Sequence, residues 1–130
     1  MKTTTILFAC RQNAGRSQIA AALAKQLAPA GVTIRSAGTT PAAEIHPAVR
    51  TALAERGLRP ANPTPILLTP ETIQESDWVI TMGCGESCPI FPGKHYEDWD
   101  IADPAEMPPA AVAEVIAEVE ARVTDLLARI

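Results

Sequence analysis

An apolar strand, a short polar loop and the start of an alanine-rich helix follow one another in Ile6-Leu7-Phe8-Ala9-Cys10-Arg11-Gln12-Asn13-Ala14-Gly15-Arg16-Ser17. A helix that begins directly after such a loop turns its first N–H groups and the positive end of its dipole toward the loop. Several backbone N–H groups can then converge on one bound anion. This order of elements therefore predicts an anion-binding loop at the end of the first strand.

Cys10 occupies the first position of this loop. A thiol beside a helix N-terminus and arginine side chains favours the thiolate form, which is the reactive nucleophile. The planar guanidinium of Arg16 can hold a tetrahedral oxyanion through two hydrogen bonds, and the Ser17 hydroxyl can donate to the sulfur. The predicted oxyanion-binding residues are Arg11, Gln12, Asn13, Ala14, Gly15, Arg16 and Ser17. A left-handed backbone is expected at Asn13, since short polar side chains tolerate it.

Two other interpretations of Cys10 compete with a catalytic one. Free cysteine is among the most buried residue types, so Cys10 could simply end a core strand. Leu7-Phe8-Ala9-Cys10 also resembles a lipoprotein acylation site, but its apolar stretch is shorter than the roughly 7–15 residues of an export signal. The loop lacks the Gly-Lys-Ser/Thr ending of nucleotide-binding loops, so ATP and GTP are not expected.

Strand and helix patterns alternate along the rest of the chain. We expect strands over residues 3–9, 32–37 and 78–82, and helices over 16–28, 46–57, 71–76 and from 108 onward. Ile19, Leu23 and Leu27 form one face of the first helix. The last helix carries an apolar stripe of Val112, Val115, Ile116, Val119, Val123, Leu126, Leu127 and Ile130. This alternation predicts a single α/β domain over residues 1–130, with a parallel sheet covered on both faces by helices.

Two further cysteines stand in Thr81-Met82-Gly83-Cys84-Gly85-Glu86-Ser87-Cys88-Pro89, directly after the strand expected over 78–82. Ligands of parallel sheets lie at the carboxyl ends of the strands, so Cys10 and Cys84 could be neighbours in the fold. The glycines and Pro89 favour a loop that moves, as a thiol relay requires. A zinc half-site completed by Cys10 and His95, or two inert thiols, are the alternatives.

Composition narrows the function further. A net charge of −4 argues against nucleic acid as a partner. No apolar stretch approaches the ~18 residues of a membrane span, and the expected location is the cytoplasm. Three cysteines in such a chain are expected to be catalytic or metal-binding rather than structural. Attraction of an anion must then be local, from the loop N–H groups and from Arg11, Arg16 and Arg35.

Three segments in order resemble the low-molecular-weight tyrosine phosphatase superfamily. They are Cys10 with Arg16-Ser17, Ser36-Ala37-Gly38-Thr39 and Asp103-Pro104, and the resemblance covers nearly the whole chain. Within this superfamily, Cys84 and Cys88 resemble the thiol pair of the thioredoxin-coupled arsenate reductases. The resemblance implies a three-layer α/β fold with a four-stranded parallel sheet of flavodoxin-like order, and a reaction that needs no metal and no cofactor.

The resemblance also implies a reaction, the reduction of arsenate to arsenite. Cys10 attacks arsenic, Asp103 assists proton transfer, and disulfides form first between Cys10 and Cys84 and then between Cys84 and Cys88. Phosphate and sulfate would compete with arsenate, and thioredoxin or a similar dithiol protein would be the reductant. The short step from Cys84 to Cys88 leaves a small thiol with a glutaredoxin-like protein as the other possible donor.

Two other functions fit parts of the pattern. A tyrosine phosphatase would use Cys10, Arg16 and Asp103 alone, and a non-enzymatic zinc or oxyanion-binding protein would use the same loops without turnover. Residues 105–107 are Ala-Glu-Met, where tyrosine-specific phosphatases commonly carry aromatic side chains. This difference and the second thiol pair favour the reductase.

Overall fold

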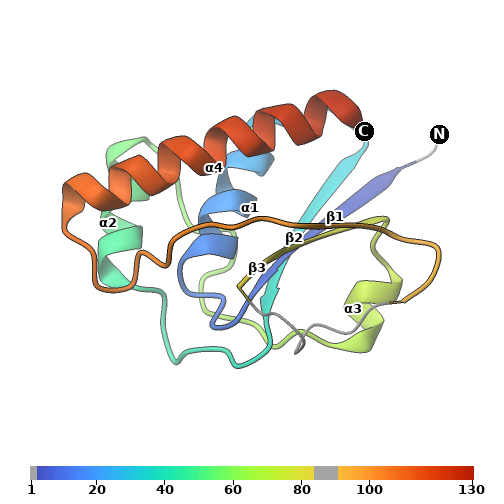
Figure 1. Ribbon diagram of the computed structural model, residues 1–130, viewed down its shortest axis with the longest axis horizontal. Coiled ribbons are helices and arrows are strands. Elements are labelled where there is room, and N and C mark those ends of the chain that lie inside the picture. The colour runs from blue at the N-terminus through green and yellow to red at the C-terminus, as the bar shows by residue number, and fades with distance from the viewer. Residues whose placement is uncertain (1–2, 84–90) are drawn as a thin grey trace.

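The computed structural model describes residues 3–83 and 91–130, so the predicted thiol pair, Cys84 and Cys88, lies outside the described residues. In chain order the elements are β1 (Thr4–Cys10), α1 (Arg16–Leu27), β2 (Val32–Gly38), α2 (Pro47–Glu55), α3 (Pro70–Gln74), β3 (Trp78–Met82), β4 (His95–Asp98) and α4 (Pro109–Arg129). Figure 1 shows the long helix α4 lying beside α1, with α3 at the other side of the strands.

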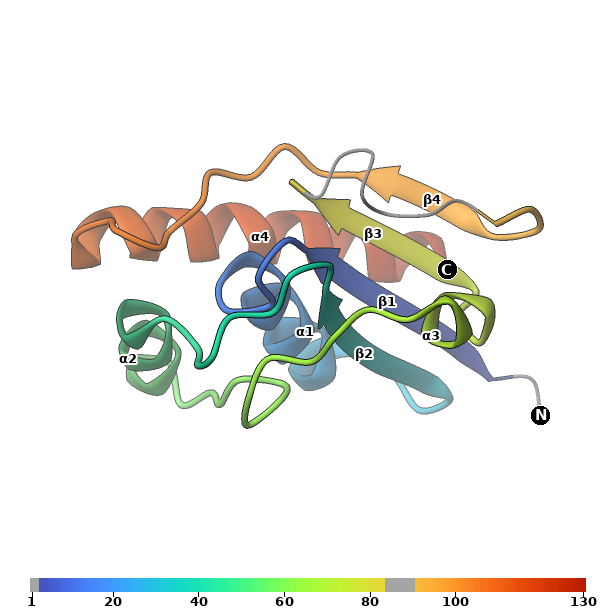
Figure 2. The same ribbon diagram turned by 90° about the horizontal axis from the view of Figure 1, so that it is seen from below.

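The strands form one parallel sheet in the order β2-β1-β3-β4 (Figure 2). This confirms the four-stranded parallel sheet and its flavodoxin-like order. Cys10, the last residue of β1, pairs with Gly38 on one side and with Met82 on the other. The carboxyl ends of three neighbouring strands therefore meet beside the loop that follows β1.

The central strand β1 is buried on both faces, as is usual in parallel sheets. Ile6 and Phe8 pack in the cluster that includes α1 and α4, whereas Leu7 packs against Ile73 of α3 on the opposite face. This alternation is the two-residue period of a strand. Cys10 belongs to the face of α1, so its side chain lies beside the start of that helix.

Local signals set the helix boundaries. α1 follows Gly15 and ends two residues before Pro29. α2 begins at Pro47, whose fixed φ angle suits the first helical position, and it ends at Glu55. Gly57 has a φ of 73°, as predicted for the residue that terminates this helix.

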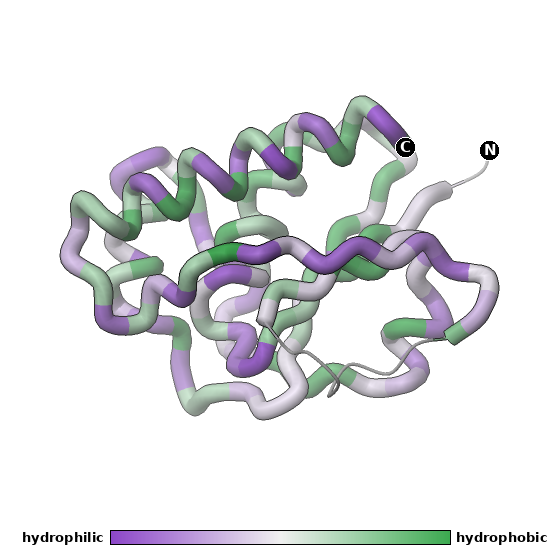
Figure 3. Tube along the Cα trace, viewed as in Figure 1, coloured by the Kyte–Doolittle hydropathy of each residue, from purple (hydrophilic) through white to green (hydrophobic). Residues whose placement is uncertain are grey.

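The apolar stripe of α4 is largely confirmed. Its buried residues are Val112, Val115, Ile116, Val119, Val123 and Leu126, and apolar and polar residues alternate along the helix in Figure 3. Ile130 was wrongly included, because it lies beyond the helix and is 38% exposed. Leu27, on the predicted face of α1, is 44% exposed at the end of its helix. Within the described ranges, no helix is long and apolar enough to span a membrane.

Candidate active site

A cleft of about 390 Å³ opens where the carboxyl ends of β1 and β3 meet the start of α1. The described residues that line it are Cys10, Arg11, Gln12, Gly15, Arg16, His46, Gly83 and Asp103. The sequence predicted six of these eight as site residues, all but His46 and Gly83. The fold thus brings Asp103 to the loop after β1, as the sequence predicted.

Cys10 lies at the floor of this cleft with 2% of its surface exposed. Its Sγ atom lies 2.9 Å from the Oγ atom of Ser17 and accepts a hydrogen bond of 3.2 Å from the backbone N–H of Asn13. The Asn13 side-chain amide donates to Ser17 Oγ at 2.8 Å, which leaves the hydroxyl hydrogen of Ser17 for the sulfur. The sulfur is therefore held by two donors at the floor of the cleft.

The side chain of Asn13 organises the loop from beneath. Its backbone has a φ of 51°, which confirms the predicted left-handed conformation. Its Oδ1 atom accepts hydrogen bonds from Gln18 Nε2 at 3.2 Å, Asn62 Nδ2 at 3.2 Å and the Ile66 N–H at 2.9 Å. Its Nδ2 atom also donates to Ser36 Oγ at 2.5 Å. A buried polar network that is fully bonded in this way fixes the loop in one conformation.

The backbone of the loop is held from one side by residues 39–46. These residues donate hydrogen bonds from Thr39 to Cys10, from Thr40 to Arg11, from Ala42 to Gln12 and from His46 to Ala14, at 2.7–3.1 Å. The loop carbonyl oxygens are therefore occupied. Because the first N–H groups of a helix have no partner within the helix, the start of α1 is suited to bind an anion.

The end of β2 passes so close to the loop after β1 that only glycine fits at position 38. A Cβ atom at Gly38 would lie 2.7 Å from the Asn13 nitrogen and 2.8 Å from the Arg11 oxygen. No side chain fits between atoms this close, so the end of β2 approaches the loop only as glycine.

Arg16 and Asp103 face each other across the cleft. One guanidinium nitrogen of Arg16 donates to the Ile101 carbonyl at 3.3 Å, and another lies 3.8 Å from the Asp103 carboxylate. The side chain of Asp103 is half exposed and accepts a 3.0 Å hydrogen bond from the Ala105 N–H. A fixed cation and an accessible carboxyl group therefore stand at the same opening.

His46 also lines the cleft, although the sequence placed it only at the start of a helix. It does precede α2, and its N–H donates to the Ala14 carbonyl, but its side chain also lines the cleft. No local pattern marks it, because residues 39–46 reach the loop only through tertiary packing. Arg35 was wrongly predicted to attract the anion. It lies within β2, three residues before the strand ends, and pairs with Glu75 at 2.7 Å away from the cleft.

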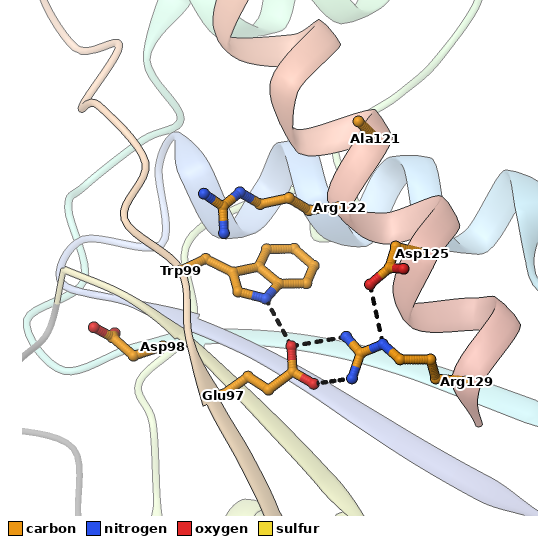
Figure 4. A pocket seen from close by; sticks show the side chains of 7 residues that line it. All are labelled: Glu97, Asp98, Trp99, Ala121, Arg122, Asp125 and Arg129. Atoms are coloured by element: carbon orange, nitrogen blue, oxygen red, sulfur yellow. Dashed lines mark hydrogen bonds and ion pairs between the residues drawn. The ribbon is translucent and has the colours of Figure 1, made fainter.

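A second hollow, of about 460 Å³, lies between β4 and α4 (Figure 4). The Glu97 carboxylate there accepts hydrogen bonds from Trp99 Nε1 at 3.0 Å and from two nitrogens of Arg129 at 2.5 and 3.0 Å. The Arg129 bond, aided by Trp99, lowers the pKa of Glu97 although burial opposes it, and the same pairing raises the pKa of Arg129. Asp125 also accepts from Arg129, at 3.0 Å. This cluster joins the edge strand to the last helix.

Comparison with known proteins identifies the family. The family model described as low molecular weight phosphotyrosine protein phosphatase matches residues 5–130. The chain therefore belongs to this family, which confirms the resemblance seen in the loop after β1 and in Asp103-Pro104.

Three relatives are individually informative. A protein described as a putative arsenate reductase of Halobacterium salinarum is 33% identical, over 95% of this chain and 91% of its own. The glutaredoxin arsenate reductase of Synechocystis is 28% identical, over 96% of this chain and 97% of its own. A solved structure, the thioredoxin-dependent arsenate reductase of Corynebacterium glutamicum, is 46% identical with a TM-score of 0.83 and covers 96% of this chain. The present chain spans only 60% of that Corynebacterium chain.

Proposed function

We propose that this protein reduces arsenate to arsenite through a chain of thiol–disulfide exchanges that begins at Cys10. The observation that carries the proposal is the Cys10 sulfur, which accepts two hydrogen bonds at the floor of a cleft shared with Arg16 and Asp103. Relatives that cover nearly the whole chain are described as arsenate reductases. Such chemistry needs a reducing compartment, so we place the reaction in the cytoplasm.

The first step is attack of the Cys10 thiolate on arsenic. A sulfur–arsenic bond forms, and one arsenate hydroxyl group leaves as water after taking a proton from Asp103. Arg16 and the N–H groups at the start of α1 offset the negative charge that builds on the remaining oxygens. Phosphate and sulfate have the same tetrahedral shape and compete for this position.

The second step transfers electrons to arsenic. The Cys84 thiolate attacks the Cys10 sulfur, the sulfur–arsenic bond breaks, and its electron pair stays on arsenic, which leaves as arsenite. The two thiols are oxidised to a Cys10–Cys84 disulfide. Two contacts support this route: Met82 pairs with Cys10 in the sheet, and Gly83, directly before Cys84 in the sequence, lines the cleft.

The third step restores Cys10. The Cys88 thiolate attacks the Cys84 sulfur and displaces the Cys10 thiolate, which leaves a Cys84–Cys88 disulfide. An external dithiol protein, either thioredoxin or a glutaredoxin-like protein working with a small thiol, then reduces that disulfide. Both donors occur among the relatives of this chain: one relative is described as a thioredoxin-dependent arsenate reductase and another as a glutaredoxin arsenate reductase.

The relay is tested by stopping it at each thiol. Cys88→Ser should release one arsenite per chain and retain a Cys10–Cys84 disulfide, identified by peptide mapping under non-reducing conditions. Cys84→Ser should stall earlier, with arsenic still bound to Cys10. Full multiple turnover of Cys88→Ser with thioredoxin alone would remove Cys88 from the relay. Full activity of the Cys84→Ser, Cys88→Ser double variant with a small thiol would show that Cys10 is the only cysteine the reaction needs.

Family membership favours a second activity, the hydrolysis of phosphate esters. Cys10, Arg16 and Asp103 suffice for phosphoryl transfer, whereas reduction needs further thiols. We expect weak hydrolysis of small aryl phosphates that is lost in Cys10→Ser and kept in Cys84→Ser. If phosphotyrosine peptides were hydrolysed with a kcat well above the common value of ~10 s⁻¹, the phosphatase would be the main function.

A further inference from the structure

The mouth of the cleft determines which oxyanions fit. A nucleophile displaces the group opposite to its own line of attack, and Cys10 attacks from the floor. The oxygen that leaves therefore points to the mouth. In a free oxyanion this oxygen is bare or carries a proton, and in an ester it carries the organic group.

Polar side chains line most of this cleft. Apart from Cys10 and the two glycines, the described lining residues are Arg11, Gln12, Arg16, His46 and Asp103. Among the described residues, no aliphatic or benzene-type side chain lines the cleft. An aryl group bound there would remove polar side chains from water without offering them hydrogen bonds, which costs free energy.

The backbone of His46 is held beside the loop that follows β1. Its backbone N–H donates to the Ala14 carbonyl at 3.0 Å. Its backbone carbonyl accepts hydrogen bonds from the N–H groups of Val49 and Arg50 in the first turn of α2, each at 3.0 Å. Its Cδ2 atom would lie 3.2 Å from a Cβ atom at Gly15, so the imidazole packs directly against the residue that precedes α1. The half-buried imidazole lines the same cleft as Cys10, where a ring N–H can donate a hydrogen bond to a bound anion.

We propose that His46 is a specificity-determining residue, whose ring N–H donates to the outward oxygen of a free tetrahedral oxyanion. Inorganic arsenate and phosphate are thereby preferred over aryl phosphate esters. The physiological substrate in this scheme rests on the proposed arsenate reduction. The preference itself is a property of binding, so it can be measured with phosphate whether or not arsenite is formed.

The chain contains only two histidines, which makes a direct test available. His95 lies in β4 and stacks on Trp78, with ring centroids 4.4 Å apart, and it does not line the cleft. Titration with phosphate, followed by NMR of the imidazole nitrogens, should shift the His46 signals at saturation and leave those of His95 in place. Unmoved His46 signals at saturating phosphate would overturn the proposal.

Variants test the same point by affinity, in a Cys10→Ala background that prevents turnover. His46→Phe keeps a ring but loses the donor, so we expect phosphate affinity to fall about tenfold and phenyl phosphate affinity to stay within about twofold. His46→Gln should recover most of the phosphate affinity, and His95→Phe should match the parent. Equal loss for both ligands in His46→Phe, or no recovery in His46→Gln, would show that the ring only supports the loop. Arsenite release by the wild type is measured separately and tests the reductase itself.

Discussion

Gly83 lies against the guanidinium group of Arg16. A Cβ atom at Gly83 would come within 2.9 Å of the Arg16 Cζ atom, and the backbone there has a φ of 83°. The end of β3 and the cleft arginine therefore occupy adjoining space, with no room for a side chain between them. A side chain at Gly83 would have to displace the Arg16 guanidinium group.

We predict that Gly83→Ala weakens anion binding by displacing Arg16. The substitution adds backbone strain of about 1–2 kcal/mol and a methyl group in contact with the guanidinium. Phosphate affinity, measured by titration calorimetry, should fall at least tenfold. Gly93→Ala is the matched control, because Gly93 has a similar φ of 85° but open space around it. It should lose similar stability and keep its affinity. Equal affinities in both variants would contradict the role of the contact.

Arg16→Lys should reduce turnover at least tenfold. Lysine keeps the positive charge but cannot form two parallel hydrogen bonds with an oxyanion. Steady-state arsenite formation measures the effect. Arg35→Lys, whose arginine pairs with Glu75 outside the cleft, should retain wild-type kinetics. Wild-type kinetics in Arg16→Lys would show that this guanidinium does not bind the anion.

Ser17→Ala should slow alkylation of Cys10 at neutral pH several-fold, because the sulfur loses its hydroxyl donor. The experiment uses a background in which Cys84 and Cys88 are serine, so that iodoacetamide reacts at one thiol. Ser76→Ala is the control, since that buried hydroxyl donates to the Thr72 carbonyl of α3, outside the cleft. An unchanged rate in Ser17→Ala would mean that the hydroxyl does not stabilise the thiolate.

The Glu97–Arg129 pair predicts a pH dependence of stability. The Arg129 hydrogen bond lowers the pKa of Glu97, so the pair stabilises the fold above the unfolded pKa of about 4.5, and this contribution is lost as pH falls through the lower folded pKa. Glu97→Gln should lower the urea midpoint at pH 7 and have a smaller effect near pH 3. Glu75→Gln, in a more exposed pair with Arg35, should change the midpoint less. An effect of Glu97→Gln that does not shrink with acid would contradict the assignment.

Much of the fold, and the loop that carries Cys10, could be predicted from local sequence patterns. The apolar run ending at Cys10 and the helix after Gly15 form the first strand, loop and helix as predicted, and the strand at residues 78–82 has the predicted bounds. These features succeed because strand alternation, helix periodicity and glycine or proline boundaries depend on residues that are near one another in the chain.

The polar contacts around the site could not be predicted in the same way. Asn13 accepts hydrogen bonds from the Asn62 side chain and the Ile66 N–H, which lie about fifty positions further along the chain. Both donors belong to a proline-rich connection whose sequence has no helix or strand pattern. His46 reaches the cleft through the path of residues 39–46. The prediction for Arg35 was wrong because it rested on charge alone. Arg35 lies in the middle of β2, and its side chain is not at the carboxyl end of the strand where the cleft opens.

The hydrogen bonds that hold Asn13 depend on residues far along the chain. Ser36, Asn62 and Ile66, which hold Asn13 in place, all follow Cys10 in the chain. A chain emerging from the ribosome has synthesised its nucleophile long before the groups that align the donors to its sulfur. The groups that position Asn13 beside the Cys10 sulfur are therefore complete only once the chain has been synthesised through Ile66.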